Sequence, residues 1–156
     1  MAAVDPFVDG GYRAAMEVGG AIGRHRWWAD GDVLRIAYHG EVEREHVAAL
    51  FGVFDEFLAM HGYLLALIDL RDAGGMRPAA RRLLGEHRQD RERTSVGFFG
   101  VGPVPRLFMG LISSSMRLLG REPLHLCVAG SEAAALAWLG RERERHRTTL
   151  PVKGEP

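Results

Sequence analysis

One stretch of the chain, residues 63–82, constrains the fold more than any other. It opens with an apolar run at 63–68, which no polar residue interrupts before Asp69. A run of this length is typical of a strand that is covered on both faces, so it predicts the central strand of an α/β sheet. A polar loop at 71–75 then leads to Pro78, which suits the first turn of a helix. Sites in open α/β sheets lie beyond the carboxyl ends of strands, so this loop is the first candidate for a functional site.

Periodicity and turn signals predict the other elements. Asp30-Gly31 lies between two alternating stretches, which is the pattern of a β-hairpin. Residues 43–61 have a helical period with a wide apolar stripe, and Gly62 ends this helix. Further strands are predicted at 95–99 and 124–128, and further helices at 78–91, 105–119 and after the capping residue Ser131.

This order of elements predicts an α/β fold with a mostly parallel five-stranded sheet, an N-terminal antiparallel hairpin and four helices. The parallel strands should be joined by right-handed crossovers. With 156 residues the chain is most simply one domain, which we place at 25–140. Residues 1–24 have a weak pattern and several glycines, so they are expected to form a loose leader. Residues 141–156 are polar and are expected to be a fraying helix end followed by disorder.

The composition excludes several classes of protein. The chain has 20 basic and 20 acidic residues, so no field of one sign favours nucleic acid or a membrane surface as a partner. The single cysteine, Cys127, excludes an internal disulfide and fits a reducing compartment. We find no signal-peptide pattern and no apolar run of transmembrane length, so we expect a cytoplasmic protein without membrane insertion.

Several short motifs occur in a distinctive order. They are the tryptophan pair Trp27-Trp28, Gly40 before the first helix, the strand end LIDL at 67–70, the aromatic strand VGFFG at 96–100 and the closing EAAALAWL at 132–139. Together with the order of elements, they resemble the STAS domain, which has the SpoIIAA-like fold, over residues 25–140. The closer likeness is to an uncharacterised bacterial branch, which is related in fold to the Sec14-like lipid-binding domains. The resemblance implies a non-enzymatic module that binds a protein partner in signalling.

One departure from the family bears on regulation. Anti-sigma-factor antagonists carry a phosphorylatable serine at the start of the helix after the central strand. The matching stretch at 76–80 is Met-Arg-Pro-Ala-Ala, which contains no serine or threonine. The resemblance therefore implies the fold and the binding surface, but not a phosphorylation switch at this position.

Basic residues gather around the predicted loop and helix start. Arg77 and Arg81 fall within about 40 degrees of each other on a helical wheel, beside a helix N-terminus that favours negative charge. We expect a partner-binding surface formed by Arg71, Asp72, Arg77, Arg81 and Arg82. The alternative is an ordinary solvated helix face, in which Arg82 pairs with Glu86.

The helix predicted at 105–119 has apolar residues around much of its circumference, more than packing on one sheet face requires. Packing against the core and a neighbouring helix explains this width. A homodimer surface or an apolar ligand pocket formed by Phe57, Met109, Ile112 and Met116 would also explain it. The second possibility gives an alternative function, a carrier or sensor of a small apolar ligand such as a lipid or acyl group in a Sec14-like pocket.

Catalytic and metal-binding patterns are absent from the sequence. The seven histidines include no spacing typical of zinc, although His25, His39 and His125 could meet on adjacent strands. Ser113-Ser114-Ser115 has no nucleophile-elbow pattern around it. Asp69 and Asp72 are placed for acid–base chemistry but have no evident partner in the sequence. We therefore expect no catalytic residue, no metal and no cofactor.

Overall fold

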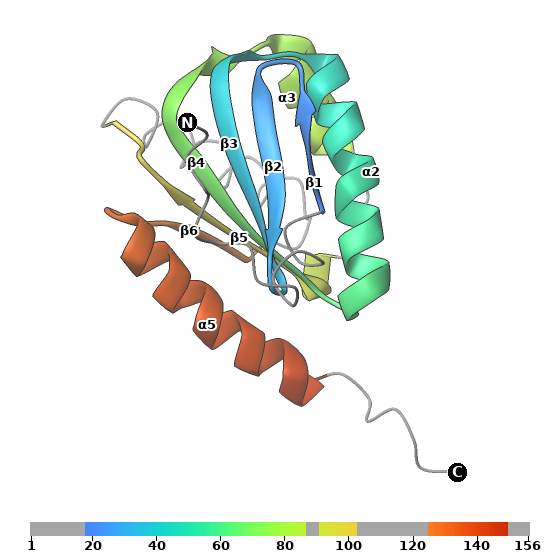
Figure 1. Cartoon of the computed structure of the whole chain (residues 1–156), viewed down its shortest axis with the longest axis vertical. Helices are drawn as coiled ribbons and strands as arrows, with labels where there is room; N and C mark the ends of the chain where they lie inside the picture. The colour runs from blue at the N-terminus through green and yellow to red at the C-terminus, as the bar shows by residue number, and fades with distance from the viewer. Residues whose placement is uncertain (1–17, 87–90, 103–124, 150–156) are drawn as a thin grey trace, which may run out of the picture.

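A six-stranded mixed sheet organises the computed structural model, which describes residues 18–86, 91–102 and 125–149. The strands lie side by side in chain order (Figure 1). They are β1 (Gly19–Ile22), β2 (His25–Asp30), β3 (Val33–Val42), β4 (Leu64–Met76), β5 (Thr94–Phe99) and β6 (His125–Val128). The described helices are α2 (Arg44–His61), α3 (Pro78–Glu86) and α5 (Glu132–Thr149), with a short 3₁₀ turn at Arg91–Arg93.

The sheet changes from antiparallel to parallel at β3. β1, β2 and β3 pair antiparallel, whereas β3, β4, β5 and β6 pair parallel. The α/β class and the N-terminal hairpin at Asp30-Gly31 are therefore confirmed. The helix predicted at 105–119 lies outside the described residues, so three of the four expected helices are described.

The sheet starts earlier than the sequence predicts, because residues 19–22 form β1 within the stretch assigned to a loose leader. This strand was missed because its glycines give no side-chain pattern. The structure gives Gly20 a reason: a Cβ there would lie only 3.0 Å from the indole nitrogen of Trp27. The absence of a side chain lets the Trp27 ring lie over the edge strand.

Helices cover both faces of the sheet. On one face, α2 and α3 pack on a large apolar cluster, to which β3 contributes Leu34 and Ile36. On the other face, α5 packs on a smaller cluster through Ala135 and Leu139. The two groups of helices lie on opposite sides of the strands in Figure 1. None of the helices in the described part of the chain has the length and hydrophobicity required to span a membrane.

The central strand is longer than predicted. The stretch at 71–75, which the sequence predicts as a loop, is part of β4 and pairs with β3 as far as Met76 opposite Val42. Two irregularities in the β3–β4 register accompany this extension. A Cβ at Gly74 would lie 3.0 Å from the carbonyl carbon of Gly40, so glycine allows the two strands to approach closely. Polar and glycine residues suggested a loop, but pairing with a distant strand keeps the backbone extended.

The last helix is also longer than predicted. α5 continues to Thr149, whereas the sequence predicts fraying from about residue 141. The Ser131 hydroxyl accepts a hydrogen bond from the Ala134 amide at 3.2 Å, which confirms the predicted cap. The second half of the helix stays ordered because its polar side chains bind partners on the sheet.

Candidate functional site

An ion pair between Asp69 and Arg71 lies within β4, at the point where the pairing of β4 with β5 ends. The Arg71 guanidinium donates to both carboxylate oxygens, with Nε–Oδ1 at 3.0 Å and Nη2–Oδ2 at 2.7 Å, and lies 5.4 Å from the centre of the Phe99 ring. The hydrogen bonds from Arg71 lower the pKa of Asp69. Asp69 is therefore ionised at neutral pH and unsuited to act as a general acid.

Two further ion pairs join β3 to the end of β4 and the start of α3. Asp72 Oδ2 lies 3.5 Å from His39 Nδ1, and Arg77 Nη2 lies 2.9 Å from Glu41 Oε2. The Arg77 amide also donates to the Val42 carbonyl, which holds the backbone at this point. The side chains of Asp72 and Arg77 remain 71% and 58% exposed, so both are accessible to a partner.

The structure brings together only part of the predicted arginine surface. Arg81 follows Arg77 by one turn, with its amide bonded to the Arg77 carbonyl at 3.1 Å, and Arg82 is exposed beside it. Arg71 points to Phe99, which belongs to the cluster under α5, so it lies toward the opposite face from α3. The predicted surface thus lies along the edge of the sheet where β3 and β4 end, and not along an outer strand. Arg71 lies toward one face of the sheet and the α3 arginines lie toward the other.

The residues expected to form an apolar surface or pocket are described only in part. Phe57 is buried and packs in the cluster beneath α2. Met109, Ile112 and Met116 lie outside the described residues. His25, His39 and His125, which the sequence allowed to meet, are not brought together, since β4 and β5 separate β3 from the strand that carries His125. Within the described residues, no group of three or more potential ligand side chains is arranged to hold a metal ion.

A polar cluster that the sequence did not predict ties α5 to the β2–β3 turn and to Tyr63, which directly precedes β4. Asp32 accepts two bonds from Arg143, at 2.7 and 2.6 Å, and one from the Tyr63 hydroxyl at 2.6 Å. Burial would raise the pKa of Asp32, but the hydrogen bonds from Arg143 and Tyr63 lower it to about 2. The charged pair therefore persists at any physiological pH.

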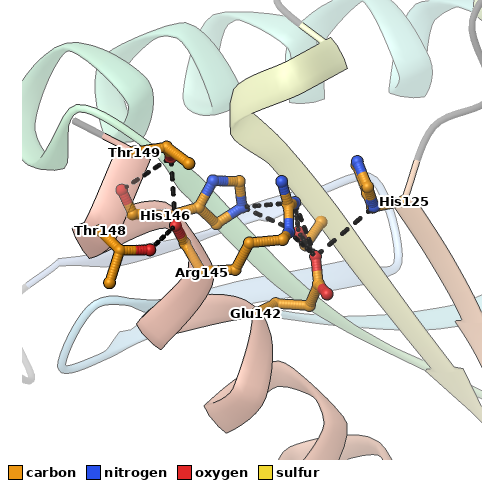
Figure 2. Close-up of polar contacts among 7 residues, drawn as sticks. His125, Glu142, Arg145, His146, Thr148 and Thr149 are labelled. Atoms are coloured by element: carbon orange, nitrogen blue, oxygen red, sulfur yellow. Dashed lines mark hydrogen bonds and ion pairs between the residues drawn. The ribbon is translucent and has the colours of Figure 1, made fainter.

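A second polar cluster lies farther along α5 and includes a serine next to a histidine. Ser95 Oγ lies 2.7 Å from Glu142 Oε2 and 2.9 Å from His146 Nε2. Arg145 donates to the same Glu142 oxygen at 2.7 Å, and His125 approaches it at 3.7 Å (Figure 2). The His146 ring also stacks on Tyr63, with ring centres 5.5 Å apart.

The Ser95 cluster is unsuited to nucleophilic catalysis. The serine hydroxyl has one proton, which it donates to the Glu142 carboxylate and therefore does not donate to His146. A general base would have to accept the serine proton instead. Ser95 and His146 are also 0% and 1% exposed, which leaves no access for a substrate. The cluster therefore fastens the helix to the sheet.

Sequence reasoning missed both clusters because their partners are far apart in the chain, 111 residues in the case of Asp32 and Arg143. One local signal could have indicated them. Glu142 and His146 are spaced by one helical turn, with Arg143 beside them, and the intervening Glu144 is exposed. This spacing places polar residues on one side of a helix that faces the sheet, and it is less typical of a frayed tail.

No protein-family model and no curated protein sequence matches the chain. Among solved structures, it is similar to an uncharacterised protein of the DUF3478 family with a SpoIIAA-like fold, from Shewanella loihica PV-4. That match has 20% identity and a TM-score of 0.48, covering 78% of this chain and 95% of that chain.

The chain is also similar to the anti-sigma factor antagonist SpoIIAA in its unphosphorylated form. This match has 11% identity and a TM-score of 0.52, covering 76% of this chain and 97% of that chain. The agreement extends over almost the whole of that protein. The chain therefore has the SpoIIAA-like fold of STAS domains.

Proposed function

We propose that the chain is a non-enzymatic cytoplasmic signalling module that binds a protein partner through the edge formed by Arg71, Asp72, Arg77, Arg81 and Arg82. The observation that carries this proposal is the arrangement around Arg77. Its backbone is fixed by the Val42 carbonyl, while its side chain is mostly exposed and forms a surface ion pair with Glu41. A rigid backbone that presents exposed charges is suited to recognition, because little ordering is required on binding.

The fold supports the class of function, since the similar SpoIIAA is an anti-sigma factor antagonist. Regulation is expected to differ from that of phosphoserine-bearing members. Residues 76–80 contain no hydroxyl side chain that a kinase could modify. The positive charge at the start of α3 is therefore constitutive, and binding should respond to ionic strength instead of to kinase activity. Exposed charges are screened over about 8 Å at physiological ionic strength.

The test is an affinity pull-down from cells of the native organism with the double variant Arg77→Glu, Arg81→Glu. We expect the variant to lose the partners that the unaltered chain recovers, and recovery by the unaltered chain to fall as salt is raised. The melting temperature should change little, because surface substitutions usually alter stability by less than about 0.5 kcal/mol.

The matched control is Arg26→Glu with Arg141→Glu, which reverses two exposed arginines on β2 and α5, away from the start of α3. This control variant should recover the same partners as the unaltered chain in the pull-down. Equal recovery by the test variant and the unaltered chain would remove the edge from the proposal. Native mass spectrometry of the purified chain tests the alternative function, since a tightly bound lipid or acyl molecule would favour an apolar-ligand carrier.

A further inference from the structure

A pair of histidines joins the first turn of α2 to the start of β2. His25 is 1% exposed and lies beneath the N-terminus of α2. Its Nδ1 accepts a hydrogen bond from the His39 amide at 3.0 Å, and its Nε2 lies 3.0 Å from Nδ1 of His46. The two rings meet edge to face, with centres 4.4 Å apart.

The hydrogen bonds allow only one arrangement of protons. A backbone amide can only donate, so Nδ1 of His25 carries no proton, and the neutral ring must carry its proton on Nε2. That proton is donated to Nδ1 of His46. The same His46 nitrogen also accepts the Glu43 amide at 3.1 Å, so it carries no proton either. Both rings are therefore neutral, and every ring nitrogen at this contact has a partner.

An added proton has no acceptor at this contact. On His25 it would face the His39 amide, and on Nδ1 of His46 it would face two donors. Burial, followed by the charge of His46, lowers the pKa of His25.

Around the pair, burial and the charges of His46 and His39 lower the pKa of His25 and outweigh a hydrogen bond to the Glu41 backbone that raises it. β3 contributes Tyr38, whose ring centre is 5.1 Å from that of His25 and whose pKa is raised by burial, and His39, which lies next to Asp72. Glu43 is engaged in capping α2. β1 contributes no titratable group, and Arg24 and Arg26 flank His25 in the chain.

The contact connects three parts of the fold. His46 lies in the first turn of α2, His25 begins β2, and the turn between β1 and β2 packs against the His46 ring, since a Cβ at Gly23 would lie 2.7 Å from its Nε2. Ile22 and Trp27 are packed nearby on the cluster beneath α2. Separation at this point would expose them.

We infer that the His25–His46 pair is an acid-sensitive contact, which holds the β1–β2 turn and the first turn of α2 on the sheet while His25 is neutral and releases them when His25 gains a proton; we call this contact the latch. The release is fully suppressed above the ordinary histidine pKa of about 6.5 and increases as pH falls below it, because the opened form binds more protons. Acidification would thus loosen one end of the molecule while α5 stays fastened by its own ion pairs.

The test uses the full-length chain and follows two NMR signals between pH 7.5 and 5. We expect the Cε1 proton of His25 to keep its neutral chemical shift well below pH 6.5. Over the same range, protection of the His39 and Glu43 amides against hydrogen exchange, corrected for intrinsic rates, should fall about tenfold for each pH unit. Protection of the β4 and β5 amides should remain unchanged over this pH range, because the opening is local and does not unfold the central strands.

Variants separate this contact from general acid effects. Asparagine places an oxygen near the Nδ1 position and does not titrate, so the double variant His25→Asn, His46→Asn should lose the pH dependence of Glu43 protection, whatever its stability at pH 7.5. The matched control is His61→Asn at the other end of α2. This variant should keep the pH dependence of Glu43 protection. The NMR titration of the unaltered chain decides the question if the double variant does not fold. A His25 titration midpoint near 6.5 with constant amide protection would overturn the inference.

Discussion

Asp32 is the clearest case of a single residue that fixes the position of an element. It lies in the turn between β2 and β3, where it accepts bonds from Tyr63 and Arg143. Since the pKa of Asp32 is about 2 in the folded chain against an ordinary value of 3.8, its ionised form contributes about 2 kcal/mol of stability at neutral pH.

We predict that Asp32→Asn lowers the free energy of unfolding by about 2 kcal/mol at pH 7 and by about half as much at pH 3. The sign follows from the lowered pKa: the contribution is complete above 3.8 and is lost as pH falls toward 2. Urea denaturation at the two pH values measures both differences. Asp30→Asn is the control, because Asp30 is exposed and its ion pair with Arg35 lies at the surface. Equal losses for the two variants at pH 7 would contradict the assignment.

At the scale of elements, α5 combines two kinds of attachment. Its first half packs through Ala135 and Leu139, and its second half binds the sheet through Glu142, Arg143 and His146. The second half has few apolar residues, so its order depends on those polar contacts. A helix that frayed after residue 140 would place none of them on the sheet.

We predict that His146→Ala costs about 2–4 kcal/mol, because it removes a buried ring stacked on Tyr63 and a hydrogen bond to Ser95. Glu144→Ala, two residues away on the exposed side of the same helix, should change stability by less than about 0.5 kcal/mol. Hydrogen exchange should show faster exchange over residues 141–149 only in the first variant. Similar stability for both would indicate that this half of the helix contributes little.

For the whole molecule, β4 makes the two faces of the sheet interdependent. Leu64, Ala66 and Ile68 belong to the cluster under α2 and α3, whereas Leu65 and Leu67 belong to the cluster under α5. A cavity on one side should therefore weaken the entire fold instead of releasing one helix.

Leu67→Ala tests this coupling. We expect a loss of about 2–5 kcal/mol, with tryptophan fluorescence and far-ultraviolet circular dichroism reporting the same shifted transition. Met60→Ala is the control, since Met60 is 66% exposed. A loss below about 1 kcal/mol, or transitions that separate, would show that β4 is not the shared centre of the fold.

The sequence by itself determined the elements whose pattern is local. The uninterrupted apolar run at 63–68 predicted a strand buried on both faces, and the Asp30-Gly31 turn and Gly62 predicted a hairpin and a helix end that the structure contains. The order of these elements then restricted the topology, because parallel strands need crossovers of one hand.

Tertiary structure alone decided the features that depend on partners far away in the chain. β1 has no side-chain pattern and exists because its backbone pairs with β2. From the sequence, the extension of β4 is predicted as a loop and the second half of α5 as a tail. The reason is that polar residues give no local sign of a distant partner. Gly40 and β3 provide that partner for β4, and Asp32 and Ser95 provide it for α5. Hydrophobic periodicity records which side of an element is buried, whereas hydrogen bonds and ion pairs between distant residues form only after the chain has folded.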